Sequence, residues 1–291
     1  MSLLSALLLG LVQALTEFLP VSSTAHLLVF GELLGQHLED EHFRAFVTII
    51  QSGTTLAVLI YFRVELARLL AAGLGSLKRL RPFENRESRL AWYIVLGTIP
   101  AAVLGKLLER RIEALGNMVI AGSLIVLGLV LVVAERLARH VRTVEDVTAG
   151  DALLVGCGQA LALVPGSSRS GCTITAGMLL GFKREAAARF SFLLSVPIIL
   201  GAGAYKVYKD APMLRGHPDW VIATLVGTGV SAVAGYLVIG WLLGWLRTRT
   251  TYLFVVWRIV AGVAIAFLIW RGVLPSGEAP PPPAPASTSA P

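Results

Sequence analysis

Apolar runs long enough to cross a lipid bilayer recur along the sequence. A helix needs about 20 predominantly apolar residues to span the hydrocarbon core. The clearest runs of this kind occupy residues 90–108, 118–134, 219–246 and 252–270. Only 15% of the residues are charged, whereas soluble globular domains carry roughly 25%. The sequence therefore predicts an all-α, multi-pass (polytopic) membrane protein.

Shorter or more polar helices are expected beside these runs, at 3–18, 22–34, 43–62, 151–163, 168–180 and 185–206. The densest basic cluster lies between residues 78 and 89. Because Lys and Arg concentrate on the cytoplasmic side of membranes, we predict a cytoplasmic loop there. Membrane orientation also accounts for the net charge of +7, so no nucleic-acid partner is expected. The Pro- and Ala-rich residues 276–291 are predicted to be a disordered tail.

Two of the predicted helices end at a proline within the apolar part of the chain. Helix 3–18 is followed by Pro20, and helix 151–163 is followed by Pro165. Proline lacks a backbone donor and disfavours a helical residue before it, so both helices should stop. Broken helices at membrane depth are tolerated only where protein or a water-filled cavity satisfies the freed backbone groups. The two breaks are therefore the expected places for a functional site.

The two breaks also resemble each other. Gln-Ala-Leu, Pro and Ser-Ser occur in this order from Gln13 and again from Gln159, allowing a one-residue gap. Paired broken helices in two homologous halves are typical of duplicated membrane folds, whose site lies between the repeats. We predict two inverted repeats, about 1–108 and 118–270, with re-entrant broken helices. Together they form a single membrane domain, 1–275.

Glu17 is an ionisable residue within an apolar helix, and such residues mark functional sites by default. Gln13 lies four residues earlier, on the same helix face. A carboxylate with an amide oxygen suits a hard divalent cation such as Mg²⁺ or Ca²⁺. The alternative is a structural Glu17 that caps a helix or pairs with an arginine.

The first break continues with Ser22, Ser23, Thr24 and then His26. Hydroxyl residues at a helix start are ordinary caps, but a helix N-terminus with free N–H groups also binds anions. His26 lies one turn past Ser22 and could serve as a nucleophile, as a general acid or base, or only as a hydrogen-bond donor to phosphate. The alternative is a buried histidine with a purely structural role.

The second break carries the strongest signal, an arginine between apolar half-helices. Arg169 is surrounded by glycine and hydroxyl residues, whereas an arginine at an ordinary helix end would reach toward the interface. Glycine lets the backbone approach a ligand closely, and the guanidinium matches a phosphate bidentately. We expect a phosphate-binding loop made of Gly166, Ser167, Ser168, Arg169, Ser170 and Thr173.

Taken together, the motifs at 13–17, 18–26 and 165–173 resemble the bacterial undecaprenyl-diphosphate phosphatases, the BacA-type bacitracin-resistance proteins. The resemblance runs from about residue 3 to residue 270. It implies a duplicated, re-entrant helical fold that hydrolyses undecaprenyl diphosphate and requires a divalent cation. It also implies a bacterial cytoplasmic membrane location among membrane lipids, with a site opening to the outer face. The sequence does not fix the oligomeric state, and a homodimer is among the candidate assemblies.

Residue by residue, the resemblance assigns cation binding to Gln13 and Glu17. It assigns catalysis to Ser23 and His26, and phosphate binding to the loop residues Ser168, Arg169, Ser170 and Thr173. From the chemistry of the residues themselves, Glu17 and Arg169 are further catalytic candidates, and Ser22, Thr24, Gly166 and Ser167 are further candidates for substrate binding. Gln13 departs from the glutamate that many members carry, which puts its contribution to cation binding in doubt. The identity of the nucleophile stays open between Ser23, His26 and water.

Two other classes of function are open to this sequence. A lipid-phosphate transporter or flippase would use the same broken helices and the same anion site. A membrane scaffold would use the polar residues only for folding. Release of phosphate distinguishes an enzyme from a transporter, and the phenotype of Arg169→Ala distinguishes both from a scaffold. The signatures of the unrelated type-2 phosphatidic-acid phosphatases are absent from the sequence.

Overall fold

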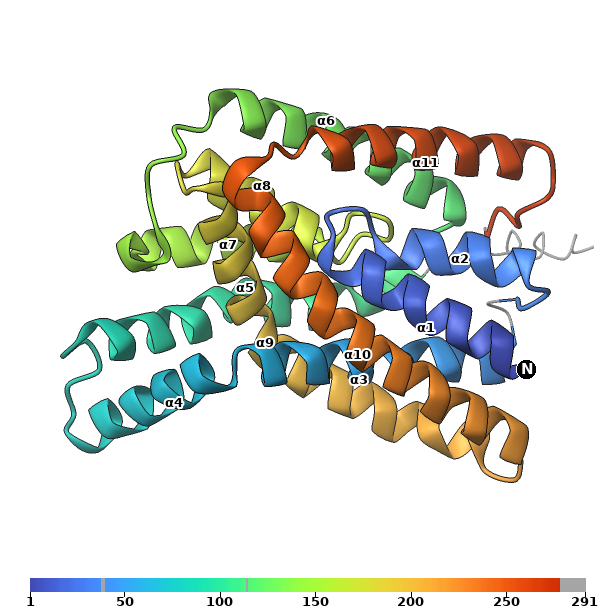
Figure 1. The fold of residues 1–291 in the computed structure, drawn as a ribbon, viewed down its shortest axis with the longest axis horizontal. Helices are drawn as coiled ribbons and strands as arrows, with labels where there is room; N and C mark the ends of the chain where they lie inside the picture. The colour runs from blue at the N-terminus through green and yellow to red at the C-terminus, as the bar shows by residue number, and fades with distance from the viewer. Residues whose placement is uncertain (38–39, 114, 278–291) are drawn as a thin grey trace, which may run out of the picture.

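The computed structural model describes residues 1–37, 40–113 and 115–277, with the backbone alone at 109, 110 and 113 (Figure 1). Within these ranges the chain is helical and contains no β-strand, as predicted. The α-helices are α1 (Leu3–Phe18), α2 (Ser23–Leu33), α3 (Glu41–Tyr61), α4 (Arg63–Lys78), α5 (Arg86–Glu113), α6 (Asn117–Leu137), α7 (Ala149–Leu161), α8 (Arg169–Leu179), α9 (Arg184–Asp210), α10 (Pro218–Thr248) and α11 (Tyr252–Trp270). Two short 3₁₀ helices, η1 (Val144–Asp146) and η2 (Ala211–Leu214), lie in connections.

Six helices in the described ranges are long and apolar enough to cross a membrane: α3, α5, α6, α9, α10 and α11. The four runs that the sequence marked most clearly lie within α5, α6, α10 and α11. The prediction of an all-α, multi-pass membrane protein is confirmed at this level.

Helix α4 was not predicted. Residues 63–78, for which no helix was predicted, form a helix that begins directly after α3, and the predicted basic loop is shortened because α5 already begins at Arg86. Leu, Ala, Arg and Glu dominate its sequence and favour a helix. Its charges, however, remove the apolar run by which a span is recognised. The Trp92 indole donates to Ser76 Oγ at 3.0 Å and fastens α4 to α5.

The short helices form two hairpins that meet near the middle of the molecule. In Figure 1, α1 and α2 run from the end marked N toward the centre and back, and α7 and α8 approach from the opposite end. Helix α10 crosses α1, and α5 crosses α7 in the same manner. A Cβ added to Gly10 would lie 2.5 Å from the Gly227 carbonyl oxygen, and Gly156 meets the Gly97 carbonyl even more closely. Glycine at these crossings therefore lets the backbones touch.

Ser276, the first residue of the predicted tail, and Pro275 before it are hydrogen-bonded to the helical body. The Asn117 amide donates to the Ser276 carbonyl at 2.6 Å, and the Asn117 side chain donates to the Pro275 carbonyl at 2.9 Å. Residues 278–291 of that predicted segment lie outside the described residues.

Candidate active site at the two helix breaks

Both helix breaks contain a serine in the left-handed backbone region. Ser22 has φ 74° and Ser168 has φ 68°, and each directly precedes a new helix, α2 or α8. Non-glycine residues rarely adopt this conformation because Cβ crowds the backbone, at a cost of roughly 1–2 kcal/mol. Ser168 Oγ accepts a hydrogen bond from the Gly171 amide at 3.1 Å and caps α8. Strained backbone held in place by its surroundings is characteristic of functional sites.

Gly166 also has a positive φ, of 85°, in the second break. A Cβ added there would lie 2.5 Å from the Ile120 carbonyl oxygen. Both the conformation and the close approach to α6 therefore require glycine.

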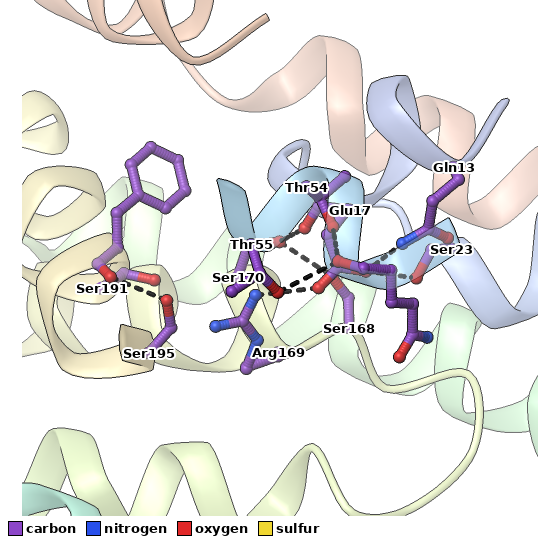
Figure 2. A network of polar contacts seen from close by, with 12 residues as sticks. Gln13, Glu17, Ser23, Thr54, Thr55, Ser168, Arg169, Ser170, Ser191 and Ser195 are labelled. Carbon is purple, nitrogen blue, oxygen red and sulfur yellow. Dashed lines mark hydrogen bonds and ion pairs between the residues drawn. The ribbon is translucent and has the colours of Figure 1, made fainter. Parts of the chain in front are cut away.

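The two breaks are joined by an ion pair between Glu17 and Arg169. Arg169 Nη2 lies 2.8 Å from Glu17 Oε1, although the residues are 152 positions apart in the sequence (Figure 2). The other carboxylate oxygen, Oε2, accepts a hydrogen bond from Ser23 Oγ at 2.8 Å and one from Gln13 Nε2 at 3.2 Å. The predicted cation-binding and phosphate-binding motifs thus form one polar cluster.

Ser170 and Thr173 support this cluster from behind. Ser170 Oγ donates to the Leu19 carbonyl at 3.0 Å, linking α8 to the first break. Thr173 Oγ1 donates to the Arg169 carbonyl at 2.8 Å and lies 2.5 Å from Ser191 Oγ in α9. Both side chains are almost fully buried, so they hold the loop and do not face the cavity.

A cavity of about 240 Å³ opens between the breaks. Among the predicted residues, its lining includes Glu17, Ser22, Ser23, Thr24, Gly166, Ser168 and Arg169. A larger cavity, of about 980 Å³, lies among α4, α5, α9 and η1. Its wall mixes acidic and basic side chains and contains none of the predicted site residues, so the smaller cavity is the candidate site.

The other predicted residues are close to the cavity but are not part of its lining. Gln13 is fully buried and Ser167 is 1% exposed. Imidazole Nδ1 of His26 lies 2.7 Å from the Ser22 carbonyl, and its Nε2 accepts a hydrogen bond from the Trp257 indole at 2.7 Å. With an acceptor at Nδ1 and a donor at Nε2, the ring is the neutral Nδ1–H tautomer. In this arrangement His26 fixes the start of α2, and its predicted catalytic role stays a prediction.

Four residues at or around the site were missed by sequence reasoning. Thr16 and Gln51 line the cavity. Gln51 is exposed and comes from α3, and its side chain makes no hydrogen bond to another described residue. Trp257 and Arg258 come from α11. The Trp257 indole donates to His26, and Arg258 donates to the Pro20 carbonyl in the first break. Only Arg258, a charge within an apolar run, carried a sequence signal that could have identified it.

The cavity offers few ligands for a cation. No group of three or more His, Cys, Asp or Glu side chains is clustered for metal binding in the part of the chain that is described. Mg²⁺, however, is commonly held by one or two carboxylates together with substrate phosphates and water. Glu17 supplies one carboxylate and Gln51 one amide among the residues that line the cavity, which fits that pattern.

Chemically, the site pairs a fixed cation with a hydroxyl that is already hydrogen-bonded to a carboxylate. Arg169 and the starts of two helices favour an anion, and phosphate is the anion whose geometry the guanidinium matches. Ser23 with Glu17 has the arrangement of a nucleophile next to a base. The fold and the site together define a multi-pass membrane protein with a polar cavity between two helix breaks, whose charge and donors suit a phosphate.

Comparison with known proteins gives the family. The model of the family described as bacitracin resistance protein BacA matches residues 6–264, and the chain belongs to that family. A protein of Anaeromyxobacter sp. (strain Fw109-5) named undecaprenyl-diphosphatase is 78% identical over 96% of this chain and 92% of its own. Proteins of the same name in Myxococcus xanthus and Chloroherpeton thalassium are 48% and 44% identical over 94% of this chain, and over 91% and 99% of their own lengths.

Proposed function

We propose that this chain is a membrane phosphatase that hydrolyses undecaprenyl diphosphate to undecaprenyl phosphate and inorganic phosphate. This reaction recycles the lipid carrier of cell-wall synthesis, and it accounts for the bacitracin resistance after which the family is named. The observation that carries the proposal is the cluster of Arg169, Glu17 and Ser23 in one cavity between the helix breaks. The family membership and the names of the relatives support it.

Substrate binding exchanges the partner of Arg169. The guanidinium now pairs with Glu17, and a diphosphate entering the cavity offers it a doubly charged, bidentate acceptor instead. Ser22, Thr24 and Ser168 line the same cavity and can donate to phosphate oxygens. Release of Arg169 frees Glu17 Oε1, while Oε2 keeps its hydrogen bond from Ser23 Oγ, so the carboxylate is left beside the hydroxyl without its cation.

Ser23 is the nucleophile that the geometry favours over His26. Its Oγ attacks the terminal phosphorus while Glu17 Oε2, 2.8 Å away, takes the hydroxyl proton. The bond from that phosphorus to the bridging oxygen breaks, and undecaprenyl phosphate leaves with the electron pair. The proton passes from Glu17 to the departing undecaprenyl phosphate, which restores the carboxylate. Water then attacks the phosphoserine while Glu17 takes a proton from it, the P–Oγ bond breaks, and Glu17 returns that proton to Ser23 Oγ as inorganic phosphate is released. His26 lies outside the lining, with both ring nitrogens engaged.

A divalent cation, Mg²⁺ or Ca²⁺, would be held by Glu17, Gln51 and the phosphate oxygens, where it would neutralise negative charge on the diphosphate. Gln13, the other predicted ligand, would instead orient the Glu17 carboxylate through the bond from Nε2. Its own Oε1 is buried without a partner.

We also propose an inverted duplication whose boundary differs from the sequence-based one. The glycine crossings pair α1 with α10 and α7 with α5, and α6 pairs with α11. These partnerships favour halves of 3–137 and 149–270, joined by the linker 138–148. Each half then has three candidate spans, an odd number that inserts the halves in opposite orientations. In this arrangement α1–α2 and α7–α8 are the re-entrant hairpins.

The proposed location is the bacterial cytoplasmic membrane, with the α4–α5 connection facing the cytoplasm. Arg79, Arg81, Arg86 and Arg89 lie at that end, as the positive-inside rule requires. The α1–α2 hairpin opens to the opposite end (Figure 1). We propose that the cavity opens toward that end, as the family resemblance implies, and receives its lipid from the outer leaflet.

The test is phosphate release from undecaprenyl diphosphate by the purified full-length protein in detergent, with Mg²⁺ or with excess EDTA. Ser23→Ala should lower kcat by about 10³-fold or more, and Glu17→Gln similarly. Arg169→Lys should lower kcat/KM by about 10²-fold, because Lys keeps the charge but loses the fork. Ser195→Ala serves as the control, since this buried serine donates only to the Phe192 carbonyl.

A phosphoserine trapped in the wild type and absent from Ser23→Ala would support the covalent route. Full activity of Ser23→Ala would eliminate Ser23 as the nucleophile and return the choice to His26 or water. A folded wild type that binds the lipid but releases no phosphate would overturn the proposed function in favour of a transporter.

A further inference from the structure

Arg258 is a buried cation without an acidic partner. It lies in α11, a candidate membrane span, and is 1% exposed. The described part of the chain gives it no ion pair, although a charge in such a position normally pairs with an opposite charge. All of its hydrogen bonds go to backbone carbonyls instead. Burying an unpaired guanidinium costs free energy, so the carbonyl groups that Arg258 binds should show what the residue does.

The four carbonyls belong to three separate parts of the chain. Nη1 donates to Pro20 O at 3.1 Å in the first break, and Nη2 donates to Ser167 O at 2.9 Å in the second. Nε and Nη2 also donate to the α6 carbonyls Leu124 O, at 3.2 Å, and Ser123 O, at 3.3 Å. One planar group therefore ties both breaks to each other and to α6.

The two break carbonyls lie next to the strained and reacting residues. Pro20 is two residues before Ser22, and Ser167 directly precedes Ser168, the two serines with positive φ. Glu17 is three residues before Pro20, and Arg169 is two residues after Ser167. Fixing these carbonyls fixes the chain on both sides of the Glu17–Arg169 pair.

The start of α8 is shaped to admit the guanidinium. A Cβ added to Gly171 would lie 2.5 Å from Arg258 Nη1 and 3.1 Å from the Ser168 side chain. A Cβ added to Gly128 on α6 would lie 3.4 Å from the Arg258 Cβ. Two glycines from different helices thus leave room for the same side chain.

We propose that Arg258 is a positioning residue, which sets the register of the two helix breaks and thereby places Ser23 and Glu17 against the phosphate held by Arg169. This role requires the planar set of N–H donors of an arginine as well as its positive charge. Arg presents five N–H donors in one plane, whereas Lys presents three on a compact ammonium group and cannot reach all three segments. The catalytic part of this inference rests on the proposed phosphatase function.

The first measurement is steady-state phosphate release by Arg258→Lys, compared with wild type and with Arg271→Lys. Arg271 is an exposed arginine at the end of the same helix and serves as the matched control. Arg258→Lys should lower kcat at least about tenfold, because small misplacement of reacting groups is costly. Its KM should change less than about threefold, since Arg169 still binds the phosphate. A more severe variant, Arg258→Met, removes the guanidinium, and a failure to fold could follow from that alone. Gly171→Ala keeps Arg258 but crowds its guanidinium, and it should show the same loss of kcat as Arg258→Lys.

The second measurement reports register without activity. Spin labels on Leu33→Cys and Leu179→Cys, in a Cys157→Ser background, mark the exposed far ends of α2 and α8. Their distance distribution should be narrow in the wild type and broader or shifted in Arg258→Lys. A wild type that releases no phosphate would overturn the proposed function, and the spin-label distances would still decide the role of Arg258. An unchanged distribution, or a kcat within about twofold of wild type in folded Arg258→Lys, would overturn the positioning role.

Discussion

Glu17 accepts hydrogen bonds from three different side chains, and the three donors have different consequences. Arg169 and Ser23 face the cavity, whereas Gln13 is fully buried in the wall. The hydrogen bond from the buried Gln13 amide should keep the Glu17 carboxylate in its orientation when Arg169 leaves it to bind a phosphate. Gln51 also lines the cavity, and its side-chain amide makes no hydrogen bond to another described residue.

The two glutamines should therefore respond differently to truncation. Gln51→Ala should raise the Mg²⁺ concentration for half-maximal phosphate release about tenfold, because it removes a candidate oxygen ligand. Gln13→Ala should lower kcat several-fold with little change in that Mg²⁺ concentration, because it loosens the carboxylate alone. A Mg²⁺ titration of both variants against wild type measures the difference. The opposite pattern would restore Gln13 as the cation ligand.

At the scale of elements, the hairpins are positioned by backbone contact at two glycine crossings. Gly10 on α1 touches Gly227 on α10, and Gly156 on α7 touches Gly97 on α5. If α1 moved away from α10, or α7 away from α5, the helix break that follows α1 or α7 would move with it. The crossings therefore connect packing in the outer helices to the geometry of the site.

Gly10→Ala and Gly156→Ala should each destabilise the protein by about 1–3 kcal/mol, because the added methyl overlaps a carbonyl of the facing helix. Gly229→Ala and Gly122→Ala are the matched controls, with nothing within 4 Å of the added Cβ. These controls should hold or raise the melting temperature, since Ala favours a helix over Gly. Thermal unfolding in detergent gives the comparison. Equal melting temperatures in all four variants would contradict close contact at the crossings.

The linker between the proposed halves is fastened by one arginine. Arg142 donates to Asp151 at the start of α7 at 2.9 Å, to the Leu180 carbonyl at the end of α8 at 3.0 Å, and to the Asp146 carbonyl at 2.7 Å. Arg142→Ala should cost about 3 kcal/mol of stability, because it leaves the buried Asp151 carboxylate without its cation. Arg139→Ala, an exposed arginine in the same linker, should cost under about 0.5 kcal/mol. Chemical denaturation of both variants provides the test, and equal losses would mean that Arg142 has no special role.

At the scale of the whole molecule, the two hairpins enter from opposite ends and meet at the site (Figure 1). Charge distribution then determines which end faces which compartment. Phe83 is exposed in the α4–α5 connection, and Arg215 is exposed in the α9–α10 connection. These two connections lie at opposite ends of the molecule (Figure 1). The two residues report the orientation of the chain.

Phe83→Cys should react with a membrane-impermeant thiol reagent only after spheroplasts are permeabilised, and Arg215→Cys should react in intact spheroplasts. The background carries Cys157→Ser, and buried Cys172 stays in place. Labelling is measured by mass shift of the purified chain. Reversed accessibility would place the cavity opening on the cytoplasmic side and exclude the outer-leaflet substrate.

Local sequence determined the helices and the breaks. A run of apolar residues is sufficient to predict a span. Pro20 and Pro165 each follow an apolar run and stand close to serine residues, and this local combination predicted the breaks. Proline alone is not sufficient, because Pro100 and Pro197 lie inside α5 and α9. Arg169 and Glu17 could also be identified locally, because a charge in an apolar segment is costly in any fold. Helix α4 was missed because its charges hide its helical character from a search for apolar runs.

Only the tertiary structure decided which of these residues share a cavity and which support it from behind. Glu17 meets Arg169 across 152 positions, and Gln51 and Arg258 reach the site from α3 and α11. The same packing buries Gln13 and His26 behind the residues that line the cavity. Contacts between distant segments depend on how helices cross, and the crossings depend on close approach at glycines such as Gly10 and Gly156. Local propensity carries no record of such pairings, so the chemistry was visible in the sequence and its geometry was not.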